Sequence, residues 1–319
     1  MSRQTILITT LLIMVTAVLL RVTRVNSQTD TAEYKGSALC KVCHQETNKS
    51  IIESHLKSAH AKSLQKADAE GAIVADFSSN PVFKKEQVAY VLGKGNREQA
   101  FLDAKLQVLP AVWDVKSKSW KPTQAQDGAT QCVGCHVTGY DTIEKKWVEA
   151  GVNCEACHGP GSVHLANPSA KDSIVRLKDL ERDKQAMVCG QCHSKGTDPS
   201  GKFAHPIGFR PSDDLTKFFR DAKPTSHGRN QQYSEHITSK HYETIKMHCT
   251  TCHDPHGPVG ANPYNLKQAI NDQCLGCHAG TVKDMATHAP NAAPDATCAS
   301  CHMEFGAHTF KKAENQSDK

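Results

Sequence analysis

Residues 151–161 read Gly-Val-Asn-Cys-Glu-Ala-Cys-His-Gly-Pro-Gly, and the Cys-x-x-Cys-His unit inside this stretch occurs seven times in the chain. All fourteen cysteines belong to these units. They are Cys40, Cys43, Cys132, Cys135, Cys154, Cys157, Cys189, Cys192, Cys249, Cys252, Cys274, Cys277, Cys298 and Cys301. The histidines that end the units are His44, His136, His158, His193, His253, His278 and His302. No cysteine is left for a disulfide or a catalytic thiol.

The spacing of each unit suits the covalent attachment of a porphyrin. Two thiols three residues apart lie on one face of a helical turn, where both can reach the vinyl groups of one haem, and the next residue directs its imidazole at the iron. A zinc ribbon also pairs Cys-x-x-Cys units but does not need a histidine after the second cysteine. With 18 histidines in 319 residues, seven such histidines would arise by chance with a probability on the order of 10⁻⁹. The units therefore predict seven covalently bound haem c groups, with iron held by the unit histidines.

Composition agrees with a fold built around cofactors. Aromatic residues make up 6% and apolar residues 38% of the chain, which is low for 319 residues that must bury a core. Haems would supply the missing apolar surface, so the chain without haem is expected to be largely unfolded. We predict a mainly α-helical fold with long loops, organised around covalent haems, with a small antiparallel β insert in the N-terminal third.

The spacing of the units divides the chain. Residues 66–128 hold no unit and contain short β-prone runs, such as 88–92 and 111–115, broken by Gly and Pro. We interpret this insert as a scaffold rather than a docking element. The predicted organisation is a signal peptide or N-terminal anchor at 1–27, units one to four with the β insert at 28–205, and units five to seven with a disordered tail at 206–319.

The N-terminal segment indicates export. Arg3 precedes an apolar run, 6–20, which is too short to favour a full membrane span. Residues 25–27 suit cleavage after Ser27, but Arg21 and Arg24 directly follow the run, which is unusual for a cleaved signal. A cleaved signal and a retained membrane tether both remain open, and either predicts a periplasmic or extracytoplasmic location.

Charge excludes one class of partner. The net charge of +5 includes three arginines within 1–27, so the remainder carries 35 basic and 33 acidic side chains. Each ferric haem adds roughly −1 through its propionates, giving about −5 for the oxidised protein. No basic stripe with interleaved aromatics is present, which argues against nucleic-acid binding. The expected partners are redox proteins, with the donor, the acceptor and the oligomeric state undetermined.

Three stretches resemble a known family. They are the first unit followed by Ser-Ala-His-Ala-Lys at 58–62, the second unit within 131–140, and the Cys-His-Gly-Pro-Gly signature that ends at Gly161. Together they resemble the respiratory multihaem cytochromes that include the tetrahaem cytochrome c of ammonia oxidisers, the electron acceptor of hydroxylamine oxidoreductase. The resemblance covers residues 36–195 and implies a mostly helical periplasmic carrier with closely packed haems. The chain departs from the tetrahaem pattern by its 66–128 insert and by three further units.

Eleven histidines lie outside the units and could bind the far side of an iron. Six of them are favoured: His60, His164, His241, His256, His288 and His308. The first two match ligand positions of the resembled family. His241 lies in a His-aliphatic-x-Ser-x-His element that also occurs at 55–60, His256 follows a Cys-His-Asp-Pro turn, and the last two follow the final units at similar intervals. Ligation by two histidines lacks the potential-raising methionine, so low reduction potentials are expected.

The leading function is electron transfer in an anaerobic or nitrogen-linked respiratory chain, by a carrier rather than an enzyme. One alternative is a reductase of a small nitrogen or sulfur oxyanion at a five-coordinate haem, although no Cys-x-x-Cys-Lys unit is present. Another is a filament or conduit subunit. The family resemblance implies that the haem of the second unit is open, and six favoured histidines leave one of seven irons over. The competing candidates for that place are His205, His227, His236 and His248.

Overall fold

A computed structural model describes residues 32–225, 230–257, 264–282, 284–303 and 306–311. The predicted signal or anchor, His227 and nearly all of the predicted tail lie outside these residues. Within them, the longest helices fall short of the length and apolar character that a membrane span requires.

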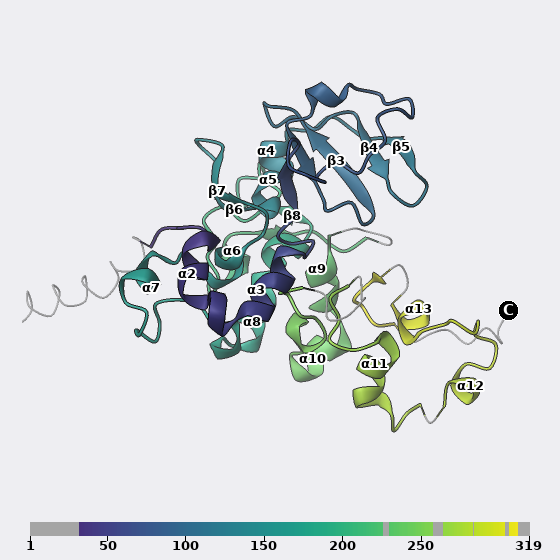
Figure 1. Ribbon diagram of the computed structural model, residues 1–319. Helices are drawn as coiled ribbons and strands as arrows, with labels where there is room; N and C mark the ends of the chain where they lie inside the picture. Colours follow the sequence, from purple (N-terminus) through teal and green to yellow (C-terminus); the bar gives the residue numbers. More distant parts are fainter. Residues whose placement is uncertain (1–31, 226–229, 258–263, 283, 304–305, 312–319) are drawn as a thin grey trace, which may run out of the picture.

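The helices are short, and most of them carry or flank a Cys-x-x-Cys-His unit (Figure 1). Among the described residues they are α2 (Ser37–Thr47), α3 (Lys49–Leu56), α4 (Gly128–Gln131), α5 (Val133–His136), α6 (Cys154–His158), α7 (Ser162–Ala166), α8 (Arg182–His193), α9 (Gln232–His236), α10 (Lys240–Ile245), α11 (Ile270–His278), α12 (Met285–His288) and α13 (Cys298–His302). Short 3-10 turns form η1 (Lys85–Gln87), η2 (Leu177–Asp179), η3 (Leu215–Lys217) and η4 (Cys249–Thr251). Helices of this length are marginal on their own, so tertiary contacts must hold them.

A five-stranded antiparallel sheet forms a lobe at the upper right of Figure 1. Its strands follow chain order: β1 (Leu64–Lys66), β2 (Tyr90–Leu92), β3 (Glu98–Leu102), β4 (Ala111–Asp114) and β5 (Ser119–Pro122). The register pairs Val91 with Phe101 and Trp113 with Trp120. The antiparallel strands expected in the N-terminal third are therefore confirmed.

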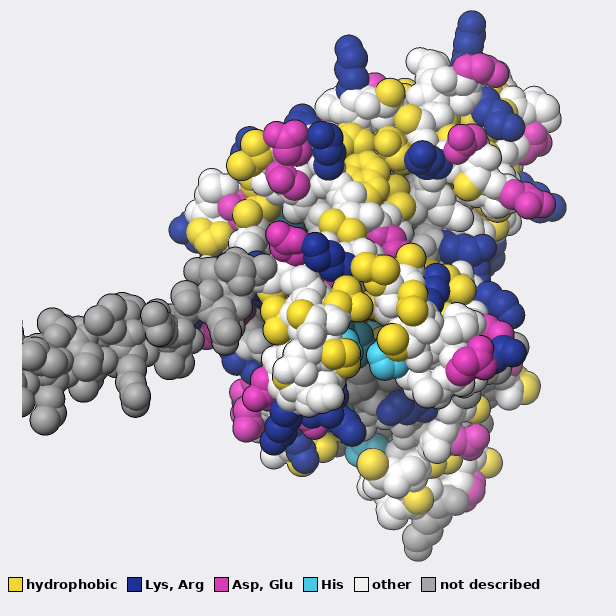
Figure 2. Space-filling view, turned by 60° about the vertical axis from the view of Figure 1, so that its left-hand side comes forward, with side chains coloured by type: hydrophobic (Ala, Val, Ile, Leu, Met, Phe, Trp, Pro, Cys, Tyr) yellow, Lys and Arg dark blue, Asp and Glu magenta, His cyan; other side chains and the backbone are white. Residues whose placement is uncertain are grey.

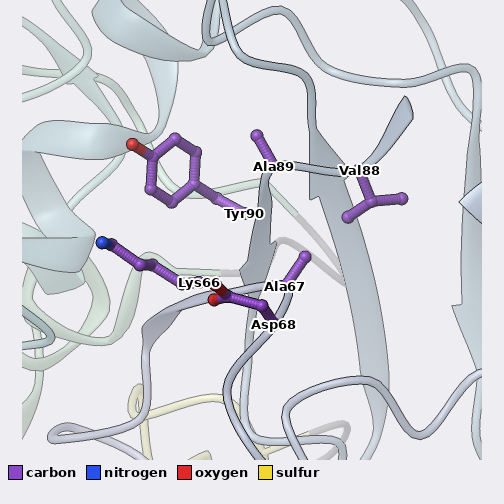
Figure 3. A pocket seen from close by; sticks show the side chains of 6 residues that line it. All are labelled: Lys66, Ala67, Asp68, Val88, Ala89 and Tyr90. Carbon is purple, nitrogen blue, oxygen red and sulfur yellow. The ribbon is translucent and has the colours of Figure 1, made fainter. Parts of the chain in front are cut away.

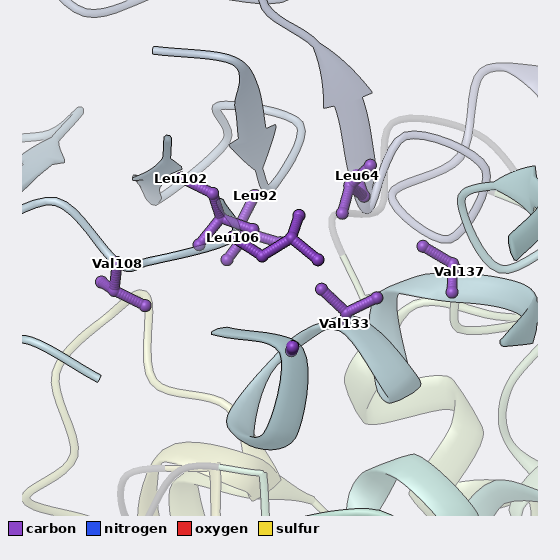
Figure 4. Packing of buried hydrophobic residues seen from close by; sticks show 8 residues of the cluster. Leu64, Leu92, Leu102, Leu106, Val108, Val133 and Val137 are labelled. Atoms are coloured by element: carbon purple, nitrogen blue, oxygen red, sulfur yellow. The ribbon is translucent and has the colours of Figure 1, made fainter. Parts of the chain in front are cut away.

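The two faces of the sheet pack into different cores, because successive side chains of a strand point to opposite sides. Val91 and Phe101 are fully buried in one core, with the aromatic rings of Phe77 and Trp120 against it. Leu92 and Leu102 face the other core, which also contains Val133 and Val137 (Figure 4). Because Val133 opens α5, this second core fixes the sheet lobe to the unit of Cys132, Cys135 and His136.

The expectation of a mainly α-helical chain holds only in part. Besides the sheet lobe, β6 (Val137–Asp141) pairs with β7 (Lys146–Ala150), and β8 (Gly196–Thr197) pairs with β9 (Arg220–Asp221). The carboxylate of Asp141 accepts hydrogen bonds from the backbone N–H groups of Ile143 and Glu144, which shapes the β6–β7 turn. This hairpin connects the second unit directly to the third. It occupies a segment that was expected to be helical.

The described residues beyond 240 have almost no core of their own. Gly257 is the one buried residue among them, although this region carries three units. A third core, around Phe209, Leu215 and Tyr233, includes α9 and reaches no further along the chain than Tyr242 of α10. The helices α11 to α13 consequently lack the apolar contacts that hold the sheet lobe, as expected of a region that packs on cofactors.

Candidate metal centres

Each unit is presented on a helical turn. Five lie within or at the end of α2, α6, α8, α11 and α13, one spans α5, and one begins on the turn η4. Side chains three residues apart share a helix face, so the two thiols of a unit project together. All fourteen thiols are free, as attachment to a porphyrin requires.

Six of the seven unit histidines face a second imidazole ring. The centroid distances are 6.3 Å for His44 and His164, 6.1 Å for His193 and His60, 6.4 Å for His158 and His256, 6.1 Å for His253 and His308, 5.9 Å for His278 and His241, and 6.0 Å for His302 and His288. Every pair joins one unit histidine to one of the six histidines favoured from the sequence. The paired residues come from distant segments, and Figure 2 shows histidine side chains gathered in a hollow of the surface.

The spacing of the pairs suits a metal between the rings. With a metal–nitrogen bond of roughly 2 Å on each side and about 1 Å from each nitrogen to its ring centre, the centroids would lie about 6 Å apart. Direct aromatic contact also allows such distances, but it does not explain why one ring of every pair belongs to a unit. The residues present therefore fit a haem iron held between two imidazoles.

Hydrogen bonds at Nδ1 orient several of the rings. Carbonyl oxygens of Val175, Tyr264 and Lys311 accept from Nδ1 of His158, His253 and His302, at 2.7, 2.8 and 2.9 Å. The carbonyl of Pro255 accepts from His60 at 3.3 Å, and Ser173 Oγ lies 3.0 Å from Nδ1 of His164. Because a carbonyl can only accept, Nδ1 carries the proton and the lone pair of Nε2 is left for a metal.

Burial favours the neutral form of four of the paired imidazoles. It lowers the pKa of His193 and of His308 to about 4, and it lowers the pKa of His60 and His158 below the usual value. A neutral imidazole has the free nitrogen lone pair that ligation needs. At neutral pH these four rings are thus in the form that binds a metal.

His136 differs from the other unit histidines. Its Nδ1 donates to the carbonyl of Ser63 at 2.9 Å, but in the described part of the chain no imidazole faces it as in the six pairs. The ring of His205 lies instead against Gly134, where an added Cβ would come within 2.2 Å of three ring atoms, and 5.7 Å from the ring of Tyr140. Gly134 thus makes room for a ring beside the second unit.

The remaining described histidines have other partners. Nε2 of His236 donates to the carbonyl of Met247 at 2.6 Å, and Nε2 of His55 lies 3.3 Å from the side-chain oxygen of Asn153. Nδ1 of His248 bonds the hydroxyl of Thr250 at 2.8 Å. None of these three faces a unit histidine in a ring pair.

Thiols of different units lie close together. Pairs of neighbouring thiols from different units are Cys40 with Cys154, Cys135 with Cys192, Cys189 with Cys249, and Cys274 with Cys298. Cys252 and Cys277 lie within electrostatic range of each other, as do Cys157 and Cys189. The units therefore form one continuous array, in which the second unit adjoins the fourth.

The sheet lobe carries a separate pocket of about 260 Å³. It is lined by Lys66, Ala67, Asp68, Val88, Ala89 and Tyr90 at the β1–β2 edge (Figure 3). Its lining contains no cysteine or histidine, so it does not belong to the array of units.

Comparison with known proteins places the chain in a family. Residues 104–159 match the family described as "Cytochrome c554 and c-prime", and residues 242–283 match the "Doubled CXXCH motif". Cytochrome c-554 of Nitrosomonas europaea is 32% identical over 226 residues, which cover 65% of this chain and 78% of that protein. The chain belongs to the multihaem c-type cytochrome family that includes cytochrome c-554.

Other members of the multihaem cytochromes differ in size from this chain. Multiheme cytochrome MtrA of Shewanella baltica is 27% identical over 179 residues, 48% of this chain, and the match spans about half (53%) of its length. The crystal structure of outer cell wall cytochrome OcwA shares the fold, with a TM-score of 0.69 and 22% identity over 87% of this chain and 79% of that one. The resemblance expected from the first four units is thus confirmed for the family.

Proposed function

We propose that this cytochrome is an exported electron carrier with seven haems, six of them held between two histidines. The pairs of cysteines in the seven units would tether the porphyrins, and the unit histidines would bind the irons. The second ligands would be His60, His164, His241, His256, His288 and His308. The observation that carries this proposal is the recurrence of six imidazole pairs, each containing one unit histidine.

The contacts between units favour transfer over an isolated redox site. Bound haem supplies one-electron chemistry, while the protein supplies position and electrostatics. Thiols of neighbouring units lie close together at four places, so the attachment points are closely spaced. Oxygen acceptors at Nδ1 hold three of the unit imidazoles in fixed orientations. Transfer within an anaerobic or nitrogen-linked respiratory chain, between partner proteins outside the cytoplasm, is the role we infer.

Intact-mass measurement of protein matured in a haem-loading, secreting host tests the count. We expect seven haem additions, and six for a variant in which Cys298 and Cys301 are both replaced by Ala. Fewer than seven additions to the fully matured parent protein would contradict the count, and bound zinc would contradict the cofactor.

A second candidate function rests on His136, which no second imidazole faces among the described residues. We propose the iron of this unit as an open site, where a small nitrogen or sulfur oxyanion could be reduced. Electron paramagnetic resonance of the oxidised protein should then show one high-spin signal that is lost when Cys132 and Cys135 are replaced. A spectrum containing only low-spin haems would remove this candidate and leave the carrier.

A further inference from the structure

A buried glutamate lies inside the third unit. Glu155, between Cys154 and Cys157 in sequence, is 1% exposed. Its Oε2 accepts from the backbone N–H of Gly36 at 2.6 Å, and its Oε1 accepts from that of Gly161 at 2.6 Å. The N–H of Lys35 lies 2.9 Å from both oxygens. Every hydrogen-bonding neighbour is a donor, which is the environment of an ionised carboxylate.

This carboxylate forms no ion pair within the part of the chain that the structure describes. Among the ion pairs of the described residues, none includes Glu155. Arg210 and Asp213, which act on Tyr34 together with Glu155, carry opposite signs. Buried charges are usually paired. A buried carboxylate without an ion pair inside a haem-attachment unit therefore suggests a functional role.

The position of Glu155 connects two units. Gly36 is the N-cap of α2, the helix that carries Cys40, Cys43 and His44, and no side chain of α2 caps its own start. A second glutamate, Glu149, accepts from the backbone N–H and the hydroxyl of Ser37, the first residue of α2, at 2.9 and 2.6 Å. Two carboxylates from the β7–α6 segment therefore cap α2, at the place where the thiols of Cys40 and Cys154 meet.

We propose that the negative charges of Glu155 and Glu149 lower the reduction potentials of the two haems held by the first and third units. The inference rests on the proposed function. A ferric iron carries one more positive charge than a ferrous iron, so a nearby buried anion stabilises the oxidised form. The start of α2 offers roughly half a positive charge in compensation, which leaves a net negative charge between the two units.

Redox titration of the holoprotein tests this role. In Glu155→Gln the carboxylate charge is lost while the side chain keeps its size. We expect unchanged haem mass and an upward shift in the midpoint potentials of two haems, with the others unmoved. The variants His164→Met and His256→Met, which alter those two haems one at a time, assign the shifted components. Glu86→Gln, on an exposed turn of the sheet lobe that carries no unit, is the matched control and should not shift any potential.

A titration of Glu155→Gln that overlays the parent curve would overturn the proposal and leave the residue with a structural role alone. If this variant does not accumulate, Glu149→Gln decides, since its side chain is only partly buried. It should raise the potential of the haem of the first unit by a smaller amount, and an overlaid curve would again reject the proposal. Failure of the proposed function is distinguishable, because it would show as a wrong haem mass in the parent protein.

Discussion

The orientation of single imidazoles depends on their hydrogen-bond partners at Nδ1. His60 is held by the carbonyl of Pro255, 195 residues away in sequence, and His158 by the carbonyl of Val175. His256 is held by the carboxylate of Asp254, 3.2 Å from its Nδ1. Outer contacts of this kind fix the tautomer and strengthen a ligand. They separate the paired histidines from His236, whose Nε2 is already occupied.

Replacing a paired histidine should change one haem. In His60→Met or His256→Met, a thioether replaces an imidazole, which we expect to raise one midpoint potential on the order of 0.1 V, within the roughly 0.8 V span set by axial ligands. Covalent attachment should be unaffected, because the cysteines are untouched. A redox titration with haem-mass control measures both effects.

The matched control is His55→Met, because His55 lies close to His60 in the sequence but its Nε2 is directed at Asn153. Its titration should coincide with that of the parent. If the His60 and His256 variants also coincide with the parent, neither residue is a ligand.

At the scale of elements, the chain contains two kinds of structure. The strands β1 to β5 hold a core of their own, with Phe101 fully buried and no unit among them. The helices α11 to α13 carry two units and bury no residue of their own. Hydrophobic burial thus stabilises the lobe, whereas the C-terminal helices depend on what the units bind.

Protein that carries no haem should therefore keep part of its fold. With all fourteen cysteines replaced by Ser, we expect limited proteolysis to leave a protected fragment containing β1 to β5, while the region beyond 240 is digested. Adding Phe101→Ala should destabilise the lobe by about 3–5 kcal/mol and abolish the protection. Adding Val82→Ala, at a side chain 63% exposed, should leave the fragment intact. Equal digestion of both regions in the cysteine-free chain would show that the lobe also depends on haem.

At the scale of the whole molecule, one ring pair and two hydrogen bonds cross the predicted division at residue 205. His158 of the third unit faces His256, and His60 is held by the carbonyl of Pro255. Likewise, Nδ1 of His193 lies 3.2 Å from the side-chain oxygen of Gln232. The histidines of the first four units therefore find some of their partners in the part of the chain beyond residue 205.

Truncation after residue 205 should open one additional haem. Without His256, the iron bound by His158 would lack its second imidazole, so the electron paramagnetic resonance spectrum should gain one high-spin signal relative to the full chain. His256→Ala in the full chain is the companion variant and should give the same added signal. If the truncated protein shows no added high-spin signal, another residue ligates this iron.

Local chemistry explains what the sequence alone determined. Haem attachment needs two thiols and an imidazole within five consecutive residues. The units and the cofactor class can therefore be identified from the sequence alone. The antiparallel strands were predictable for the same reason, since short β-prone runs such as 88–92 are local. The hairpin of β6 and β7 was missed because its runs lie directly beside units that indicated helix.

Only the tertiary structure decided which groups meet. The pairing of His158 with His256, the contact of Cys40 with Cys154 and the burial of Glu155 all join segments far apart in sequence. No periodicity or spacing encodes such contacts, because they depend on how loops close and how cores pack. Glu155 is the clearest example, since its partners are backbone N–H groups, which every segment of the chain offers alike.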